Sequence, residues 1–171
     1  MIYTAQSTVN TPLGDMLLAR TTKGLAGAWF LEGQKDTSDD LLEVPYRPQD
    51  HLLCQAAEQV LSYWQATQHH FELTLDLIGT SFQQDVWRLL LSIGPGQQRS
   101  YGDVARELGK PKGFRAVGMA VGRNPLSIIV PCHRVMGQQG HITGYSGGLH
   151  RKVALLTHEG FRVDGMQVSR P

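Results

Sequence analysis

The sequence predicts an α+β fold with a small N-terminal lobe, made of an antiparallel sheet and one helix, and a mostly helical C-terminal lobe that carries a helix-turn-helix and a reactive cysteine. Short apolar runs separated by turn signals fill the first third of the chain, whereas helical spacing of apolar residues dominates the last half. Composition and charge both change near residues 78–81. We therefore divide the chain into residues 1–78 and 79–171.

The N-terminal strands are expected to be short and closely spaced. Three apolar or loosely alternating runs are separated by two turn signals: residues 2–9, 16–19 and 25–31, with turns at 11–14 and 23–24. Strands joined by such short connections are expected to pair antiparallel.

One helix and one further strand complete this lobe. Apolar residues recur at helical spacing between residues 49 and 68, which predicts an amphipathic helix. Residues 71–77 alternate between apolar and polar side chains, the pattern of a half-buried strand.

The C-terminal lobe begins with a helix start signal. Ser81 and Gln84 have the spacing of a capping box, and a helical apolar face follows them. Residues 103–108 predict a short helix with Ser100 or Asp103 as its cap, and residues 114–123 predict a second helix. Two short helices joined across a glycine-containing turn indicate a helix-turn-helix.

The second helix of this pair has an unusual composition. It contains Gly118 and Gly122, although glycine destabilises a helix by about 1 kcal/mol relative to alanine. Arg115 and Arg123 lie near its ends, with almost no polar side chain between them. A face of small residues permits close approach, either to a nucleic-acid backbone without sequence readout or to another helix in the core. The sequence favours neither alternative.

Charge is divided unevenly along the chain. Residues 1–81 hold 4 Lys and Arg against 10 Asp and Glu, and residues 82–171 hold 12 against 5, for a formal net charge of +1. A basic half indicates a polyanion partner, and uneven scatter over two solvated surfaces is the alternative. No apolar run approaches the roughly 20 residues of a membrane span, and no secretory signal is recognisable. With only two cysteines, we expect a cytoplasmic protein that contacts no membrane.

The strongest chemical signal is the pair Cys132 and His133. An apolar, β-branched run at residues 128–130 predicts a buried strand or strand-like segment before them. The thiolate is the nucleophilic form of cysteine, and a neighbouring base increases its fraction. Adjacent residues in an extended chain point to opposite faces, so contact within the pair requires a turn or a bridging water. Glu159, which follows a predicted C-terminal helix, is a candidate to orient the imidazole.

These residues resemble a known family. Pro131-Cys132-His133-Arg134-Val135, preceded by Asn124-Pro125, resembles the active-site signature of the O6-alkylguanine-DNA alkyltransferases, or methylated-DNA–protein-cysteine methyltransferases. Further matches lie in order between residues 79 and 160: Gly79-Thr80-x-Phe82-Gln83, Val86-Trp87, Ser100-Tyr101-Gly102, Arg115-Ala116-Val117-Gly118, Gly144-Tyr145-Ser146-Gly147-Gly148, Arg151-Lys152 and His158-Glu159-Gly160. Residues 1–78 match only in layout, for which the resemblance implies a ribonuclease-H-like lobe.

The resemblance implies DNA repair by direct damage reversal. Cys132 accepts the alkyl group of O6-alkylguanine stoichiometrically and irreversibly, while His133 deprotonates the cysteine through a water, Glu159 orients His133, and Asn124 braces the active-site turn. Thiolate displacement at carbon needs no metal or cofactor, and we expect none. The resemblance further assigns base contacts to Tyr101, the backbone of Val135, Tyr145, Ser146 and Lys152, and DNA contacts to Arg115, Ala116, Gly118, Arg123 and Arg134.

The implied partner is double-stranded DNA, bound independently of sequence through the minor groove with the damaged base flipped out. We expect a monomer, and the resemblance leaves open cooperative assembly on DNA and activity on O4-alkylthymine. The main alternative is a non-catalytic alkyl-lesion-binding protein of the alkyltransferase-like type, which Cys132 disfavours. A helix-turn-helix transcription regulator would need base-specific contacts, and a thiol hydrolase would need an oxyanion pocket that nothing in the sequence indicates.

Overall fold

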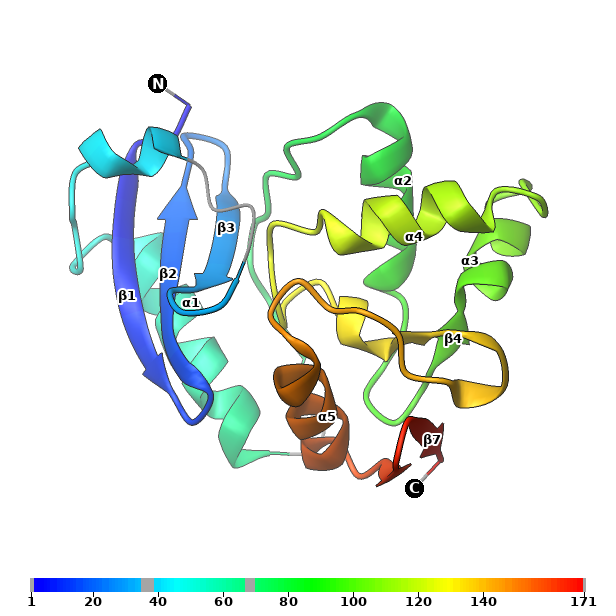
Figure 1. Cartoon of the computed structure of the whole chain (residues 1–171). Helices are drawn as coiled ribbons and strands as arrows, with labels where there is room; N and C mark the ends of the chain where they lie inside the picture. The colour runs from blue at the N-terminus through cyan, green and yellow to red at the C-terminus, as the bar shows by residue number, and fades with distance from the viewer. Residues whose placement is uncertain (1, 35–38, 67–69, 171) are drawn as a thin grey trace. The chain divides into compact units, whose positions relative to one another are not determined.

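The structure is a computed structural model that describes residues 2–34, 39–66 and 70–170 (Figure 1). It divides into two compact units, Met1–Ile78 with Pro125–Ile129, and Gly79–Asn124 with Val130–Pro171. Helices and small sheets are both present, so the α+β class is confirmed. The structure differs from the expected division in one respect, because residues 125–129 group with the first unit.

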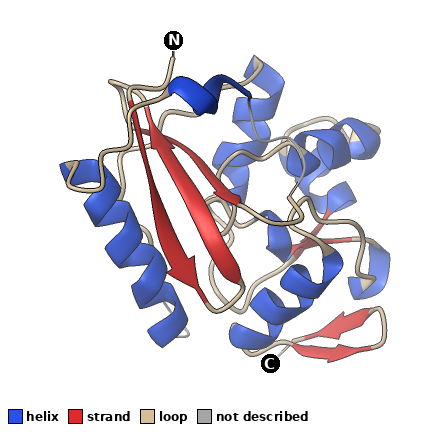
Figure 2. Ribbon diagram, turned by 60° about the vertical axis from the view of Figure 1, so that its left-hand side comes forward, coloured by secondary structure: helices blue, strands red, loops and turns tan. Residues whose placement is uncertain are grey.

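The first unit is built on a three-stranded antiparallel sheet in the order β1 (Ala5–Thr11), β2 (Gly14–Arg20), β3 (Leu25–Phe30). The helix α1 (His51–Gln65) runs along the sheet and contacts all three strands (Figure 2). Every residue of β3 is buried, which explains why its sequence is continuously apolar rather than alternating.

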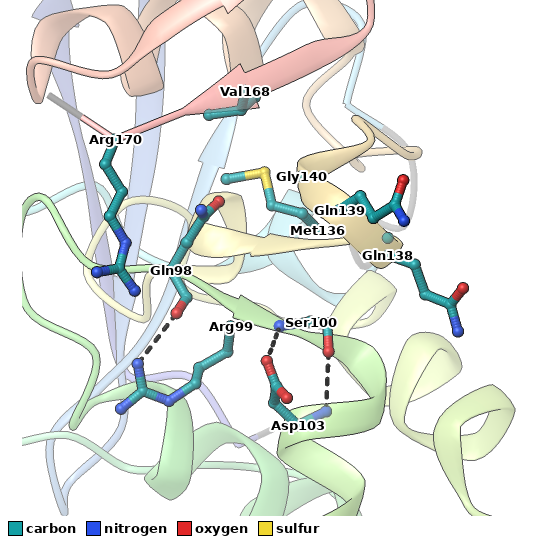
Figure 3. Close-up of a pocket in the computed structure, with 11 residues that line it drawn as sticks. Gln98, Arg99, Ser100, Asp103, Met136, Gln138, Gln139, Gly140, Val168 and Arg170 are labelled. Carbon is teal, nitrogen blue, oxygen red and sulfur yellow. Dashed lines mark hydrogen bonds between the residues drawn. The ribbon is translucent and has the colours of Figure 1, made fainter.

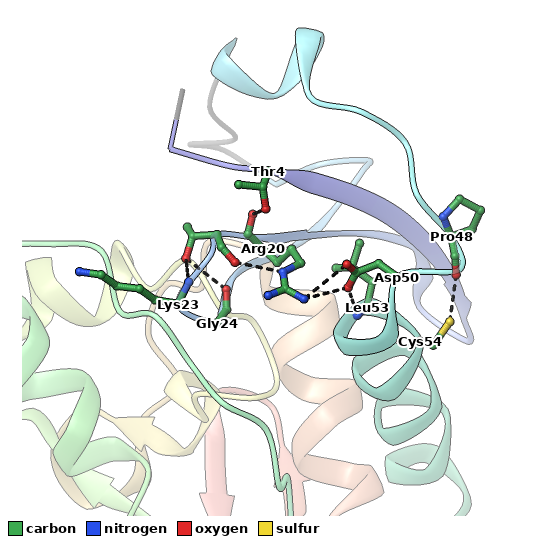
Figure 4. Close-up of polar contacts among 9 residues, drawn as sticks. Thr4, Arg20, Lys23, Gly24, Pro48, Asp50, Leu53 and Cys54 are labelled. Carbon is green, nitrogen blue, oxygen red and sulfur yellow. Dashed lines mark hydrogen bonds and ion pairs between the residues drawn. The ribbon is translucent and has the colours of Figure 1, made fainter.

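One polar contact fixes the start of α1. Asp50 is its N-cap and accepts a hydrogen bond from the backbone N–H of Leu53 at 3.0 Å. Arg20, at the end of β2, pairs with the same carboxylate at 3.1 Å (Figure 4). Burial works to raise the pKa of Asp50, but the Leu53 N–H and the Arg20 guanidinium hold it below its ordinary value. The helix is therefore tied directly to the sheet that it covers.

The strand predicted at residues 71–77 is wrong. This segment makes only an isolated bridge between Leu75 and Leu25, with the Leu25 N–H donating to the Thr74 carbonyl and the Asp76 N–H donating to the Leu25 carbonyl, each at 2.8 Å. Alternation of apolar and polar side chains indicates an extended segment with one buried face. It does not show whether that segment pairs with a sheet along its length or, as here, at one residue.

Residues 125–129 lie beside β3. The Ala28 N–H donates to the Pro125 carbonyl at 2.8 Å, and the Ser127 N–H donates to the Ala28 carbonyl at 3.0 Å. The side-chain amide of Gln34 also donates to the Ser127 hydroxyl at 3.1 Å. The first unit thus holds the segment of chain that leads into Cys132.

The second unit contains four helices and two small strand pairs among its described residues. The helices are α2 (Ser81–Leu90), α3 (Tyr101–Glu107), α4 (Phe114–Gly122) and α5 (Leu149–His158). The strand pairs are the parallel β4 (Arg99–Ser100) with β5 (Val135–Met136), and the antiparallel β6 (Arg162–Asp164) with β7 (Gln167–Ser169). Among the described residues, no helix is both long enough and apolar enough to cross a bilayer.

The helix caps correct the sequence analysis by one residue. Thr80, not Ser81, caps α2, and its capping-box partner is Gln83, not Gln84. The predicted and observed capping boxes differ by one position, because the sequence has a hydroxyl residue followed three residues later by a glutamine in both registers. For α3, Ser100 is the cap: its hydroxyl oxygen accepts from the Asp103 backbone N–H, and the Asp103 carboxylate accepts from the Ser100 backbone N–H.

The helices α3 and α4 pack against each other as the predicted helix-turn-helix pair, and α4 also packs against α2. Val117, Ala120 and Val121 form the buried face of α4. The indole N–H of Trp87, on α2, donates to the Ala120 carbonyl at 2.8 Å. This buried bond fixes which face of α4 turns inward.

The observed cap makes a testable distinction. Thr80→Ala removes the side-chain oxygen that accepts the Gln83 N–H, and we expect the free energy of unfolding to fall by about 1 kcal/mol. Ser81→Ala should change it by no more than about 0.5 kcal/mol, because Ser81 caps nothing. Urea unfolding of both variants measures the difference, and a larger loss for Ser81→Ala would restore the sequence-based cap.

Candidate functional site

The site is organised around a short turn. Cys132–Arg134 form a single 3-10 turn, and β5 follows it directly. The strand predicted at residues 128–130 is wrong, because these residues form a buried turn in which Ile128 has φ of 73°. A β-branched residue in this left-handed conformation costs on the order of 1–3 kcal/mol, so surrounding contacts must impose it. The apolar run indicates that residues 128–130 are buried, which is true of this turn as it would be of a strand.

Cys132 lies almost entirely inside the protein, with 3% of its surface exposed. The side-chain amide of Asn124 donates to the Val130 carbonyl at 2.8 Å, which braces the chain just before the cysteine. Burial raises the pKa of the Cys132 thiol, while Asn124, the charge of Lys152 and the hydroxyl of Tyr145 act to lower it. At neutral pH the sulfur therefore rests as a thiol and needs a base to become a nucleophile.

A buried carboxylate, that of Glu159, holds the imidazole of His133, the residue that follows Cys132. The Glu159 carboxylate lies 2.6 Å from Nε2 of His133, and both side chains are fully buried. The guanidinium of Arg134 donates to the same carboxylate through two nitrogens, at 2.7 and 3.0 Å. A third Arg134 nitrogen donates to the Ile93 carbonyl at 2.5 Å. The cluster thus joins the turn to the end of α5 and the segment after α2.

The charges in this cluster determine the tautomer of His133. Although burial works to raise the pKa of Glu159, His133 and Arg134 hold it far below its ordinary value, so the carboxylate is ionised and only accepts hydrogen bonds. Nε2 of His133 must therefore carry the proton. Burial also lowers the pKa of His133, which keeps the ring neutral and leaves a lone pair on Nδ1. Nδ1 is buried and finds no hydrogen-bond partner within the described part of the chain.

The remaining predicted pocket residues are linked by a second set of contacts. The ammonium of Lys152 is fully buried and donates to the carbonyls of Val135, at 2.8 Å, and Thr143, at 3.4 Å. Burial lowers the pKa of Lys152 to about 8, although the nearby Cys132 acts to raise it. The Tyr101 hydroxyl lies 2.6 Å from the Thr143 hydroxyl. Burial raises the pKa of Tyr101, and Cys132 contributes in the same direction.

The parallel pair β4–β5 brings these residues to the cysteine turn. Arg99 pairs with Val135 and Ser100 with Met136. Because α3 begins with Tyr101 directly after β4, and β5 follows the Cys132 turn, this pairing sets the position of the tyrosine relative to the sulfur. Ser146 is half-buried, and its hydroxyl oxygen is buried without a hydrogen-bond partner in the described residues.

The predicted DNA-contacting residues on and directly after α4 are mostly exposed, and Gly118 is half-buried beside the Tyr101 ring. Arg115, Ala116, Met119, Gly122 and Arg123 are exposed. A Cβ atom added to Gly122 would meet nothing within 4 Å, so helix packing does not require glycine at that position. At Gly118 it would lie 3.8 Å from the Tyr101 ring, an ordinary van der Waals distance. The small-residue face of α4 therefore lies largely at the surface.

Arg134 is a correction to the sequence analysis, which groups it with the DNA contacts. Only 6% of Arg134 is exposed, and its guanidinium is occupied by Glu159 and the Ile93 carbonyl. Its place in the sequence, next to the Cys-His pair, does not distinguish a surface cation from a buried one.

Two cavities lie near the site. The larger, of about 540 Å³, is lined by Gln98, Arg99, Met136 and Arg170 among others, and by none of the predicted site residues (Figure 3). The smaller, of about 460 Å³, is bordered by Tyr101, Arg106 and Phe114. Cys132 lines neither of them. The second cavity reaches the site only through Tyr101.

Sequence reasoning missed Thr143, whose hydroxyl and carbonyl both contact predicted site residues. It lies in a loop between short motifs, and a lone threonine before a glycine has no periodicity or spacing that marks it. Within the described residues, no group of three or more His, Cys, Asp or Glu side chains is placed to hold a metal ion.

Comparison with known proteins gives a consistent result. The family model "6-O-methylguanine DNA methyltransferase, DNA binding domain" matches residues 81–161. A methylated-DNA–protein-cysteine methyltransferase of Mycobacterium bovis is 42% identical over 152 residues, which cover 89% of this chain and 90% of the relative. The crystal structure of Mycobacterium tuberculosis O6-methylguanine methyltransferase has a TM-score of 0.82 and 41% identity, covering 91% of this chain and 92% of that one. The Mycobacterium tuberculosis OGT structure in complex with DNA has a TM-score of 0.81 and 41% identity, with the same coverage.

The ionised Glu159 predicts a specific acid sensitivity. Its pKa is lowered in the folded state, so its stabilising contribution is present above its ordinary value of 4.5 and is lost as the pH falls below it. The expected loss is about 1.4 kcal/mol per pH unit from this one group. Urea unfolding between pH 7 and pH 3 should show a steeper decline for wild type than for Glu159→Gln.

Asp164→Asn, at an exposed carboxylate of β6, serves as the control and should follow the wild-type curve. Parallel curves for wild type and Glu159→Gln would contradict the assignment of an ionised buried carboxylate.

Proposed function

The chain belongs to the family of methylated-DNA–protein-cysteine methyltransferases, and we propose that it repairs DNA by moving the alkyl group of O6-alkylguanine to its own Cys132. The observation that carries this proposal is geometric: the Cys132 thiol and the His133 imidazole lie in one buried turn, and the buried Glu159 carboxylate lies 2.6 Å from Nε2 of the imidazole. This arrangement matches a nucleophile, a base and an orienting group.

The bond changes follow from these roles. The Cys132 proton passes to the lone pair on Nδ1 of His133, through a water, and the thiolate sulfur bonds to the alkyl carbon. The bond between that carbon and O6 breaks, and its electrons pass to the base, which takes up a proton and leaves as guanine. The product is a thioether, and no group at the site is suited to cleave it. One chain therefore performs one transfer.

The environment of Cys132 suits a protein that reacts once. A permanently ionised thiolate is open to oxidation and to stray alkylation, whereas a buried thiol with a raised pKa is protected. Asn124, Lys152 and Tyr145 stabilise the anion once His133 has taken the proton. These three groups therefore stabilise the thiolate during the reaction, although they do not keep the sulfur ionised before it.

The damaged base must reach a sulfur that is covered. A base inside a duplex hides its O6 atom, so the nucleotide is flipped out at a cost of a few kcal/mol. Residues 143–148, which carry Tyr145 and Ser146, contain Gly144, Gly147 and Gly148. We assign the opening to this segment, because glycine gives the backbone the freedom to move. Tyr101, the Val135 carbonyl, Lys152 and the two hydroxyl side chains then surround the base.

The exposed face of α4 is assigned to the minor groove of double-stranded DNA. Ala116 and Gly118 allow close approach without reading base edges, which suits repair in any sequence context. Arg115 fills the space that the flipped base vacates, and Arg123 contacts phosphate. Residues 79–171 are thus the DNA-binding and alkyl-acceptor part. The protein acts as a monomer in the cytoplasm, where a free thiol nucleophile stays reduced.

Intact-protein mass spectrometry tests the transfer. After incubation with duplex DNA containing one O6-methylguanine, we expect each chain to gain one methyl group in place of a hydrogen, located on Cys132 by peptide mapping. The amount transferred should reach and not exceed one methyl group per chain. Cys132→Ser is the control, and a methyl group found on another residue, or repeated turnover, would refute the mechanism.

Salt dependence tests the DNA surface. We expect Arg123→Ala to weaken binding to undamaged duplex about equally for different sequences, and to reduce the slope of log affinity against log salt by about 0.9. Fluorescence anisotropy at several salt concentrations measures both quantities. Arg162→Ala, at an exposed arginine of β6, is the matched control. Equal effects of the two variants on affinity and on the salt slope would contradict the assignment of the exposed face of α4 to DNA binding.

A further inference from the structure

Thr143 contacts two of the residues that surround the proposed base site, Tyr101 and Lys152. Its hydroxyl lies 2.6 Å from the hydroxyl of Tyr101, at the start of α3. Its carbonyl accepts from the ammonium of Lys152, on α5, at 3.4 Å. The same ammonium donates to the Val135 carbonyl at 2.8 Å. Thr143 therefore contacts residues of two elements, Tyr101 of α3 and Lys152 of α5, and Lys152 in turn contacts Val135 of β5.

The orientation of the Thr143 side chain is restricted. A Cβ atom added to Gly137 would lie 3.2 Å from the Thr143 methyl carbon, so the methyl group lies close over that glycine. A β-branched side chain has few χ1 rotamers, and placing the methyl group largely places the hydroxyl. The hydroxyl is thereby directed to Tyr101 by packing on its opposite side.

The hydrogen bond between the two hydroxyls has a chemical consequence. A phenol has one proton to donate, and if Tyr101 gives it to Thr143 none is left for a base. If the Thr143 hydroxyl donates instead, the Tyr101 proton is free, and accepting a hydrogen bond makes the phenol a stronger donor. The Thr143 contact acts to lower the pKa of Tyr101, as expected of a bond that favours phenolate character.

The geometry points to Thr143 as a positioning residue for the transfer reaction: its hydroxyl holds the Tyr101 phenol oxygen so that the phenol proton is directed to the flipped guanine. This inference rests on the proposed function, because it needs a base beside Tyr101. Thr143 itself touches no reacting atom and acts through the tyrosine. It affects the rate of transfer more than the binding of DNA, since undamaged duplex contacts the exposed face of α4.

Single-turnover methyl transfer from duplex DNA containing O6-methylguanine tests the inference. With protein in excess at several concentrations, the limiting rate constant and the half-saturating concentration are separated. We expect Thr143→Val, which keeps the shape and the methyl contact, to lower the limiting rate constant roughly 2- to 10-fold, the range of one neutral hydrogen bond. The half-saturating concentration should stay within about 2-fold. Thr143→Ser, which restores the hydroxyl, should recover most of the rate.

Two further variants complete the design. Thr157→Val removes an exposed threonine hydroxyl of α5 and should leave the rate unchanged. Tyr101→Phe should lower the rate, and adding Thr143→Val to it should cause no further loss, because the threonine acts only through the phenol oxygen. If Thr143→Val does not fold, Thr143→Ala takes its place as the variant without a hydroxyl.

The outcomes are distinguishable. Wild type that accepts no methyl group overturns the proposed function and this inference together. Active wild type with an unchanged Thr143→Val rate overturns the inference alone. Equal losses in Thr143→Val and Thr143→Ser, or independent effects of Thr143→Val and Tyr101→Phe, would show that the residue acts by packing and also overturn it.

Discussion

The site depends on one buried carboxylate. The Glu159 side chain is fully buried, so its charge requires hydrogen-bond donors at its oxygens, and Arg134 and His133 supply them. The arginine shares the charge through a two-nitrogen contact, while burial of His133 lowers the pKa of its imidazole and favours the neutral ring. A neutral ring with its proton on Nε2 is the form that can accept a proton at Nδ1. The base role that we propose for His133 therefore depends on how this one charge is buried.

Holding the cysteine turn rigid requires contacts from several parts of the chain. The Asn124 amide fixes the Val130 carbonyl, and the β4–β5 pair fixes the chain on the other side of Cys132. Residues 125–129 are in turn hydrogen-bonded to β3, in the first unit. Within that unit, these bonds hold residues 125–129, which include the left-handed Ile128.

The sequence predicts the reacting residues better than their surroundings. Cys132, His133 and Glu159 belong to short motifs, and the helices have clear periodicity, so both were accessible without coordinates. The strand or strand-like segment predicted at residues 128–130 and the cap predicted at Ser81 were wrong, and Arg134, which was expected to contact DNA, is buried. These three differences have a common reason. The sequence shows where apolar, hydroxyl and cationic residues lie. Whether they are buried, how a segment pairs and which charges meet depend on segments distant in the sequence. Thr143 had no local signal, because its importance comes from Tyr101 and Lys152.

The division between α4 and the base site explains how selectivity and sequence independence coexist. A helix that read base edges would need Arg, Asn or Gln along its exposed face, and this helix presents Ala116, Met119 and Gly122 there. The DNA contact that we propose for this face is therefore independent of sequence, and it does not distinguish damaged DNA from undamaged. Discrimination must come from groups that a base meets only after it has left the stack. The groups that we assign to this role are the buried Lys152 ammonium with its carbonyl partners and the half-buried hydroxyls of Tyr101 and Thr143. A base that leaves one of these groups without a hydrogen bond binds less favourably, because the group is shielded from water. This difference in binding free energy is the physical source of selectivity.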